Sequence, residues 1–311
     1  MAAKSSKISI VVPVYNEVHG LDAFHKSLLQ VLKQYQYELI YVDDGSTDGS
    51  LEALQKLARK TAHTKLIRLS RNFGKELATT AGIHAATGDA VITIDGDGQH
   101  PAELIPAFIQ AWQNGAKVVI GRRTTNQHEG AVKHWGSKVF YKLFNTYTGV
   151  RLMPGSTDFR LIDREVQSQF NAMTERNRIT RGLIDWLGYD RTYLDFTANP
   201  RLHGTASYSF GKLFKLAVDS VISLSLSPLY VTAWIGAIVL PISVLAGLVM
   251  TVDYLAGNSL HLTGAAFALI LVLFLMGIVL VSQGIIGLYL SHIHTETQNR
   301  PLYVIDQQRS L

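Results

Sequence analysis

Two carboxylates one residue apart, Asp95 and Asp97, end an apolar run and are followed by the amide of Gln99 and a proline. Side chains at alternate positions where a strand ends can point into one crevice. Oxygen ligands of this kind suit Mg²⁺ or Mn²⁺, which often share their coordination shell with substrate phosphates. Because such an ion can neutralise a departing diphosphate, the spacing predicts a transferase that cleaves a nucleotide–sugar bond. A simple turn is the alternative, since Asp-Gly pairs favour turns.

Strand-like and helix-like segments alternate ahead of and beyond this pair. Short apolar runs rich in β-branched residues predict strands at Ile8–Pro13, Glu38–Val42, Lys65–Leu69, Ala90–Ile94 and Lys117–Ile120. Apolar residues at helical spacing predict helices at Leu21–Lys33, Ser50–Thr61, Lys75–Thr87 and Ala102–Gln113. The alternation predicts an α/β fold: a Rossmann-like, mostly parallel sheet with helices on both faces.

Polar clusters containing carboxylates follow three of the predicted strands: Tyr15-Asn16-Glu17, Asp43-Asp44-Gly45-Ser46 and Asp95-Gly96-Asp97. Ligands of such sheets bind at the carboxyl ends of the strands. We therefore expect the three clusters to converge on one edge. Polar turns that merely end the strands are the alternative, which carboxylates in all three clusters make less attractive.

Composition narrows the class of protein. The formal net charge of +5 fits contact with phosphate-rich partners such as nucleotides or anionic lipid heads. No basic run interleaved with aromatic residues indicates a nucleic-acid partner. The chain has no cysteine, which excludes disulfides and thiolate metal sites. The first residues lead into a strand without an apolar signal core, so the N-terminal part is expected in the cytoplasm.

Two long apolar runs near the end of the chain, Leu229–Val252 and Ala265–Leu290, each exceed the ~20 residues that cross a bilayer. The loop between them carries no Lys or Arg, whereas Lys212, Lys215 and Arg300 flank the outer ends. The positive-inside rule then predicts a hairpin in the cytoplasmic (inner) membrane with both termini in the cytoplasm.

Basic amphipathic segments at 130–150 and 205–228 are candidates for interfacial helices, or for ordinary helices packed on the core. The expected organisation is a catalytic domain over 1–209, an interfacial helix over 210–228, spans over 229–252 and 265–290 around an external loop at 253–264, and a cytoplasmic tail over 291–311.

Three motifs, Val11–Glu17, Val42–Ser46 and Asp95–Pro101, resemble those of the inverting family 2 glycosyltransferases, which have a GT-A fold. Three later pieces resemble the branch that glycosylates polyprenyl phosphates: Gly155–Leu161, Arg201–Ser209 and Asn299–Tyr303. That branch includes dolichyl-phosphate mannose synthase and bacterial enzymes of the GtrB and ArnC type. The resemblance covers nearly the whole chain.

The resemblance implies a nucleotide-binding set made of Pro13, Tyr15, Glu17, Val42, Asp43, Asp44, Asp95 and Gly96. Within this set Asp44 would accept a hydrogen bond from the base, and Asp95 would face the ribose or sugar. Asp97 and Gln99 would hold Mg²⁺ or Mn²⁺ on the diphosphate. Glu17 and Asp44 could instead cap the helices that follow them.

Catalytic and acceptor-binding roles follow from the same resemblance. Asp158 and Arg160 would line the sugar and acceptor site, and would act with Asp95 and Asp97. Phosphate or acceptor contacts are implied for Arg123, Lys133, Arg201, Ser207 and Tyr208. Lys133 stands where an arginine is common, and the motif around Ser207 lacks the lysine that is usual in the family; Lys212 is a candidate replacement.

The resemblance therefore implies inverting transfer of a sugar, with a UDP-sugar such as UDP-glucose as donor, to undecaprenyl or another polyprenyl phosphate. A GDP-mannose donor stays open. A processive polysaccharide synthase is disfavoured, because no Gln-x-x-Arg-Trp motif is present and two spans cannot easily enclose a polymer. A non-catalytic membrane adaptor conflicts with the intact acidic motif, and a transporter subunit conflicts with the nearly apolar spans. Small residues in the spans are compatible with a homo-oligomer such as a tetramer, and a separate flippase is a further expected partner.

Overall fold

The computed structural model describes residues 6–124, 153, 155–176, 178–197 and 263–311, and scattered positions between 238 and 257. The chain forms two compact units. The first comprises Met1–Thr146, Val150–Tyr208 and the later segment Arg300–Leu311. The second comprises Tyr147–Gly149 and Ser209–Asn299.

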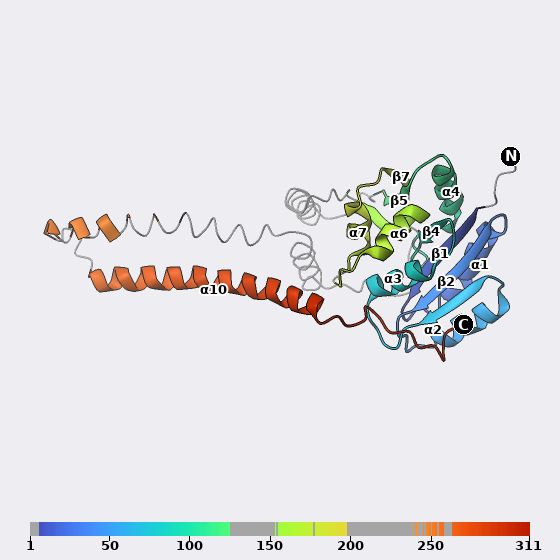
Figure 1. Cartoon of the computed structure of the whole chain (residues 1–311), viewed down its shortest axis with the longest axis horizontal. Coiled ribbons are helices and arrows are strands. Elements are labelled where there is room, and N and C mark those ends of the chain that lie inside the picture. Colours follow the sequence, from blue (N-terminus) through green and yellow to red (C-terminus); the bar gives the residue numbers. More distant parts are fainter. Residues whose placement is uncertain are drawn as a thin grey trace. The chain divides into compact units, whose positions relative to one another are not determined.

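A seven-stranded sheet forms the centre of the first unit (Figure 1). The strands are β1 (Lys7–Val14), β2 (Gln36–Asp43), β3 (Thr64–Arg68), β4 (Ala90–Thr93), β5 (Val118–Arg123), β6 (Ser156–Asp163) and β7 (Arg191–Phe196). Their order is β3-β2-β1-β4-β6-β5-β7. Every pairing is parallel except those of β6 with β4 and with β5. The predicted mostly parallel α/β sheet is confirmed.

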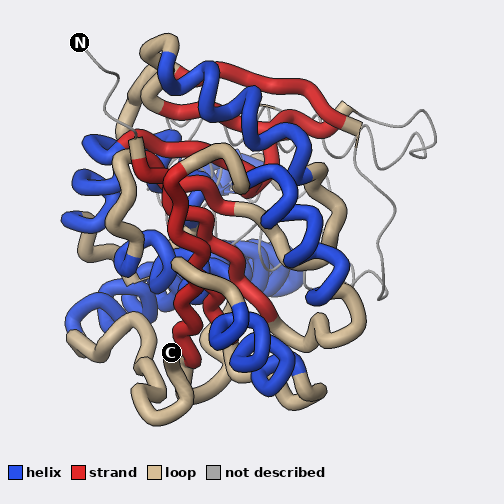
Figure 2. The backbone as a smooth tube through the Cα atoms, turned by 90° about the vertical axis from the view of Figure 1, so that its right-hand side faces the viewer, coloured by secondary structure: helices blue, strands red, loops and turns tan. Residues whose placement is uncertain are grey.

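Helices cover both faces of this sheet (Figure 2). One apolar core joins the sheet to α1 (Leu21–Leu32), α2 (Ser50–Lys60) and α4 (Ile105–Gln113), which follows a short 3₁₀ turn at Ala102–Leu104. A second core joins the other face to α3 (Lys75–Ala85), α6 (Arg164–Ala172) and α7 (Thr180–Trp186). Strand β1 contributes side chains to both cores, because Ile10 and Val12 face the first core and Val11 faces the second.

Helix α3 lies unusually close to the sheet. A Cβ atom added at Gly82 would lie 2.2 Å from Val11 Cγ1, so no larger residue fits there without a shift. Ala78 and Ala81 are buried on the same helix. These small residues let the axis of α3 approach β1, and this approach fixes where the first turn of the helix lies.

The segment around Asp158 and Arg160, for which no strand was predicted, is β6, and β7, α6 and α7 were not predicted from the sequence either. Charged residues interrupt the apolar pattern of β6 and mask it. Arg160 is only 2% exposed because its guanidinium pairs with Asp185 of α7. A pairing of this kind connects distant parts of the chain, so local periodicity does not reveal it.

In the second unit, α10 runs from Gly264 to Thr297, seven residues beyond the predicted end of its span. Within it, Phe274–Thr297 is long and apolar enough to cross a membrane, and large side chains such as Val281 and Leu290 are 63% exposed. Among the described residues this is the one helix that meets the criterion. Most of the other predicted span, 229–252, and both amphipathic segments lie outside the described residues, so the hairpin stays a prediction.

Candidate active site

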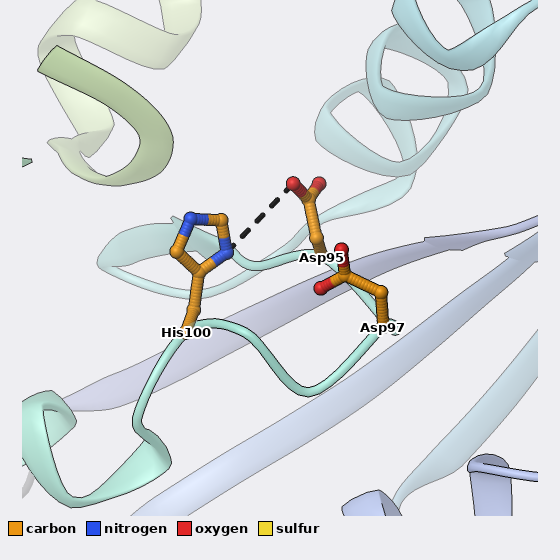
Figure 3. A group of neighbouring side chains, drawn as sticks. All are labelled: Asp95, Asp97 and His100. Atoms are coloured by element: carbon orange, nitrogen blue, oxygen red, sulfur yellow. Dashed lines mark ion pairs between the residues drawn. The ribbon is translucent and has the colours of Figure 1, made fainter. Parts of the chain in front are cut away.

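Three potential metal ligands converge in the loop after β4: Asp95, Asp97 and His100 (Figure 3). One ligand atom from each lies within 4.8 Å of the others, and Nδ1 of His100 is 3.7 Å from a carboxylate oxygen of Asp95. The imidazole is 8% exposed and packs against Phe159 and Phe196, with ring centroids 5.4 and 5.6 Å away. Burial lowers the pKa of His100, although the charge of Asp95 opposes this, so the ring is neutral near pH 7.

These residues fit a divalent cation. Nδ1 of His100 is buried and has no hydrogen-bond partner, which is costly unless a ligand uses the lone pair. Two carboxylates and a neutral imidazole form a donor set suited to Mn²⁺, and the carboxylates also suit Mg²⁺. His100 was not predicted as a ligand, although its position five residues after Asp95 was a usable signal. The backbone N–H of Gln99 donates to Asp97 at 3.0 Å, and a ligand role for the Gln99 side chain stays a prediction.

Lys75, in the first turn of α3, connects the acidic loop to β6. Its ammonium lies 2.7 Å from a carboxylate oxygen of Asp95 and 2.8 Å from one of Asp158. Burial alone would raise the pKa of Asp158, but Lys75 and then Arg181 hold it well below its usual range. Burial opposes the charge on Lys75, yet the two carboxylates raise its pKa above the usual value. Asp158 is thus ionised and Lys75 protonated near neutral pH.

A small pocket lies beside this lysine. Its walls are formed by Lys75, Glu76, Thr79, Thr93, Asp158, Arg160, Thr180 and Arg181. The carboxylate of Glu76 accepts a hydrogen bond of 2.8 Å from the backbone N–H of Thr180. Burial, followed by the charge of Asp158, raises the pKa of Glu76. No site role was predicted from the sequence for Lys75, Glu76 or Arg181, because charged residues at helix starts are common.

Arg160 lines the pocket, but its guanidinium is buried and bonds to groups inside the protein. It donates to Asp185 at 2.8 Å and to the backbone oxygen of Thr157 at 3.0 Å. The side chains of Arg160 and Asp185 are each 2% exposed. This pair ties β6 to α7 and thereby orients the pocket wall. The predicted catalytic role of Arg160 stays a prediction.

The predicted nucleotide residues lie at the carboxyl ends of β1, β2 and β4. Asp43 is fully buried and pairs with Arg68 of β3. Asp44 accepts hydrogen bonds from the backbone N–H groups of Phe73 and Gly74, at 2.7 and 2.9 Å, and burial raises its pKa. These bonds hold the loop before α3, so Asp44 does not cap the helix that follows its own strand.

The other nucleotide candidates border the same edge. A Cβ atom added at Gly96 would lie 3.5 Å from the backbone oxygen of Pro13, which places the first and third motifs in contact. Tyr15 is 46% exposed, Glu17 is half-buried, and Val42 belongs to the core. The described structure thus brings the three motifs together, and their contacts with a nucleotide stay predictions.

Of the predicted phosphate and acceptor residues, Arg123 ends β5 and its side chain is exposed. Its backbone N–H donates to Gly155 at 2.8 Å. The remaining members of this group lie outside the described residues: Lys133, Arg201, Ser207 and Tyr208.

Comparison with known proteins agrees with this geometry. The profile of glycosyl transferase family 2 matches residues 9–170. An uncharacterized glycosyltransferase of Synechocystis sp. is 38% identical over 301 residues, which are 96% of this chain and 94% of that protein. The SfII prophage-derived bactoprenol glucosyl transferase of Shigella flexneri is 37% identical over 302 residues, 96% and 97% of the two chains. A prophage bactoprenol glucosyl transferase homolog of Escherichia coli is 35% identical, covering 96% and 98%. The chain is therefore a glycosyltransferase that belongs to glycosyl transferase family 2.

Proposed function

We propose that this protein transfers glucose from a nucleotide sugar, UDP-glucose, to a polyprenyl phosphate, undecaprenyl phosphate, at the cytoplasmic face of a membrane. The main support is the convergence of Asp95, Asp97 and the unpartnered Nδ1 of His100 at the end of β4. The bactoprenol glucosyl transferases that match over nearly their whole length supply the substrate class.

Asp95, Asp97 and His100 would hold Mg²⁺ or Mn²⁺, with Gln99 as a further ligand. Such an ion, when bound, supplies neutralisation of the negative charge on the leaving diphosphate. Lys75 supplies a second positive charge a few ångströms away, and its bond to Asp158 keeps that carboxylate ionised. Asp158 would thereby be fixed beside the sugar.

The acceptor phosphate does not require a strong base. The second pKa of a phosphate monoester is about 6, so the group is already a nucleophile at neutral pH. Its oxygen attacks the anomeric carbon from the face opposite the diphosphate, and the bond from that carbon to the diphosphate oxygen breaks. An α-linked donor thus gives a β-linked product. The task of the protein is alignment and charge stabilisation, for which Arg123, Lys133, Arg201, Ser207 and Tyr208 are the proposed phosphate ligands.

The membrane part of the proposal is a hairpin of two spans, of which α10 contains one, with both termini in the cytoplasm. It would keep the active site at the surface where a lipid phosphate lies. A homo-oligomer and a separate flippase that moves the product across the membrane complete the proposal.

A donor panel tests this function. The full chain in detergent is given undecaprenyl phosphate and radiolabelled UDP-glucose, another UDP-sugar or GDP-mannose, and the lipid fraction is then extracted. We expect label in the organic phase with UDP-glucose. Preferred use of GDP-mannose would reassign the donor, and label only in polymer or protein would overturn the acceptor.

A further inference from the structure

The segment Arg300–Leu311, here termed the edge segment, covers the free edge of the sheet. Strand β3 is the first strand in the sheet order and pairs on one side with β2. On its other side, alternate residues bond to the edge segment. Leu66 exchanges two backbone hydrogen bonds of 2.8 Å with Leu311, and Ser70 N–H donates to Val304 at 2.9 Å. Residues at alternate positions point their backbone groups to the same side, so these bonds cover an edge that would otherwise be open.

Arg68 is the central residue of this contact. Its backbone N–H donates to Oγ of Ser310 at 3.0 Å, and its backbone oxygen accepts from the N–H of Asp306 at 2.7 Å. Its guanidinium turns inward and pairs with the buried Asp43 at the end of β2. The edge segment therefore holds the backbone of the residue whose side chain holds Asp43.

Further bonds fix the edge segment to two helices of the same unit. The hydroxyl of Tyr303 is 3.0 Å from Nδ1 of His84 on α3, the helix that begins with Lys75. The side-chain amide of Gln55 on α2 donates to the backbone oxygen of Arg309 at 3.2 Å. The edge segment thus contacts α2, β3 and α3, and Figure 1 shows the C-terminus beside α2.

We infer that the edge segment is a positioning element of the donor pocket, which fixes Arg68 against Asp43 and thereby sets nucleotide affinity. This inference rests on the proposed function and on the nucleotide-binding role that the family resemblance implies for Asp43. The segment begins three residues after α10 ends at Thr297, so the chain next to the predicted membrane span would act on donor binding through Arg68 and Asp43.

Titration of UDP with Mn²⁺ into the full chain in detergent tests the inference by calorimetry. Ser310→Ala removes the acceptor for Arg68 N–H, and Asp306→Pro removes the donor to the Arg68 oxygen. We expect each to raise the Kd of UDP and the KM of the donor by about five- to tenfold, since each loses a hydrogen bond to the backbone of Arg68. The acceptor KM should stay within about twofold of wild type. Gln308→Ala, an exposed position of the same segment, is the matched control.

One further variant separates the possible outcomes. Asp43→Asn tests the pocket itself. If it weakens UDP binding while Ser310→Ala and Asp306→Pro bind like Gln308→Ala, the inference is overturned and the proposed function stands. A lower unfolding temperature with unchanged Kd would also overturn it, because the segment would then be purely structural. Absence of UDP binding by the wild-type chain would reject the proposed donor and the inference together. Should Asp306→Pro not fold, Ser310→Ala decides.

Discussion

The ammonium of Lys75 lies 2.8 Å from a carboxylate oxygen of Asp158, and this ion pair joins the first turn of α3 to β6. The same ammonium reaches Asp95 in the loop that holds the candidate metal ligands. One cation thus links two carboxylates from separate parts of the chain. Its removal should affect the charge balance of the whole site.

Replacement of Lys75 by Met should lower kcat/KM at least tenfold. The carboxylate of Asp158 loses the main positive charge that keeps it ionised, and the carboxylates of Asp95 and Asp158 then repel each other. The free energy of unfolding should fall by only about 1 kcal/mol, since the side chains of Lys75 and Asp158 are 40% and 27% exposed and solvent screens the pair. Steady-state kinetics and urea unfolding measure the two effects. Lys75→Arg, which keeps the charge, should retain more activity; equal kcat/KM for Met and wild type would contradict this role.

Asp97→Ala should abolish transfer while leaving the protein folded and in the membrane fraction. The carboxylate is a proposed metal ligand and takes no part in either apolar core. Turnover, thermal unfolding and Mn²⁺ binding by electron paramagnetic resonance are the measurements. Glu103→Ala, which alters an exposed acid close to the same loop, is the control and should behave like wild type. Wild-type turnover of Asp97→Ala would refute the assignment.

Removal of divalent cations should abolish activity, and Mg²⁺ or Mn²⁺ should restore it. His100→Ala should weaken Mn²⁺ binding at least tenfold, because loss of even a residue that only hydrogen-bonds to a metal ligand costs about 10- to 100-fold in affinity. Binding is measured without donor, so the result does not depend on turnover. Full activity in excess EDTA would contradict a metal-assisted route.

Asp185→Ala should lower the free energy of unfolding by about 3 kcal/mol, because the guanidinium of Arg160 would remain buried without its carboxylate. Chemical denaturation measures the loss. The exposed Asp190→Ala in the same region should cost far less. A double variant, Arg160→Met with Asp185→Leu, should recover stability relative to Asp185→Ala, since neither charge is then unpaired. A loss no greater than that of Asp190→Ala would show that the pair contributes little.

His25 should make stability depend on pH. Its two ring nitrogens are each 2.9 Å from a hydroxyl, of Tyr41 and of Thr61, and burial lowers its pKa although Asp22 opposes this. Below about pH 6.5 the unfolded chain therefore binds a proton at this position more readily than the folded chain, and stability falls as pH falls. The decrease in unfolding free energy between pH 7 and pH 5.5 should be smaller in His25→Gln than in the exposed-site control His19→Gln. Identical pH slopes would contradict the prediction.

Much of the first half of the fold could be predicted because its elements follow local patterns. The strand predicted at Ile8–Pro13 is Lys7–Val14 in the structure, and the helix predicted at Lys75–Thr87 is Lys75–Ala85. Each of these elements buries one regular face, so the spacing of its apolar residues in the sequence indicates which face is buried. Strand β6 lacks a regular apolar spacing, because Arg160 occupies one of its buried positions and Asp185 compensates the charge.

The residues of the candidate site divide in the same way, into those that a local pattern reveals and those that only the folded structure brings together. Asp95 and Asp97 could be identified because their alternate spacing directly follows an apolar run typical of a strand. Lys75 and His100 could not, since their meaning depends on the close packing of α3 at Gly82 and on the aromatic rings around the imidazole. The contacts of the edge segment join residues more than 200 positions apart, such as Arg68 and Ser310, and no local pattern encodes them.

The reversed direction of β6 has a consequence for how such enzymes can diversify. Strand β5 ends at Arg123, β6 begins at Ser156, and the N–H of Arg123 bonds to the backbone oxygen of Gly155, so the two ends of the intervening stretch are held together. Insertions, deletions or exchanges between Thr124 and Gly155 that spare these two residues would leave the pairing of β5 with β6 intact, because both ends of the stretch are already fixed. Selection for a new acceptor could therefore act on that stretch while the donor chemistry is preserved.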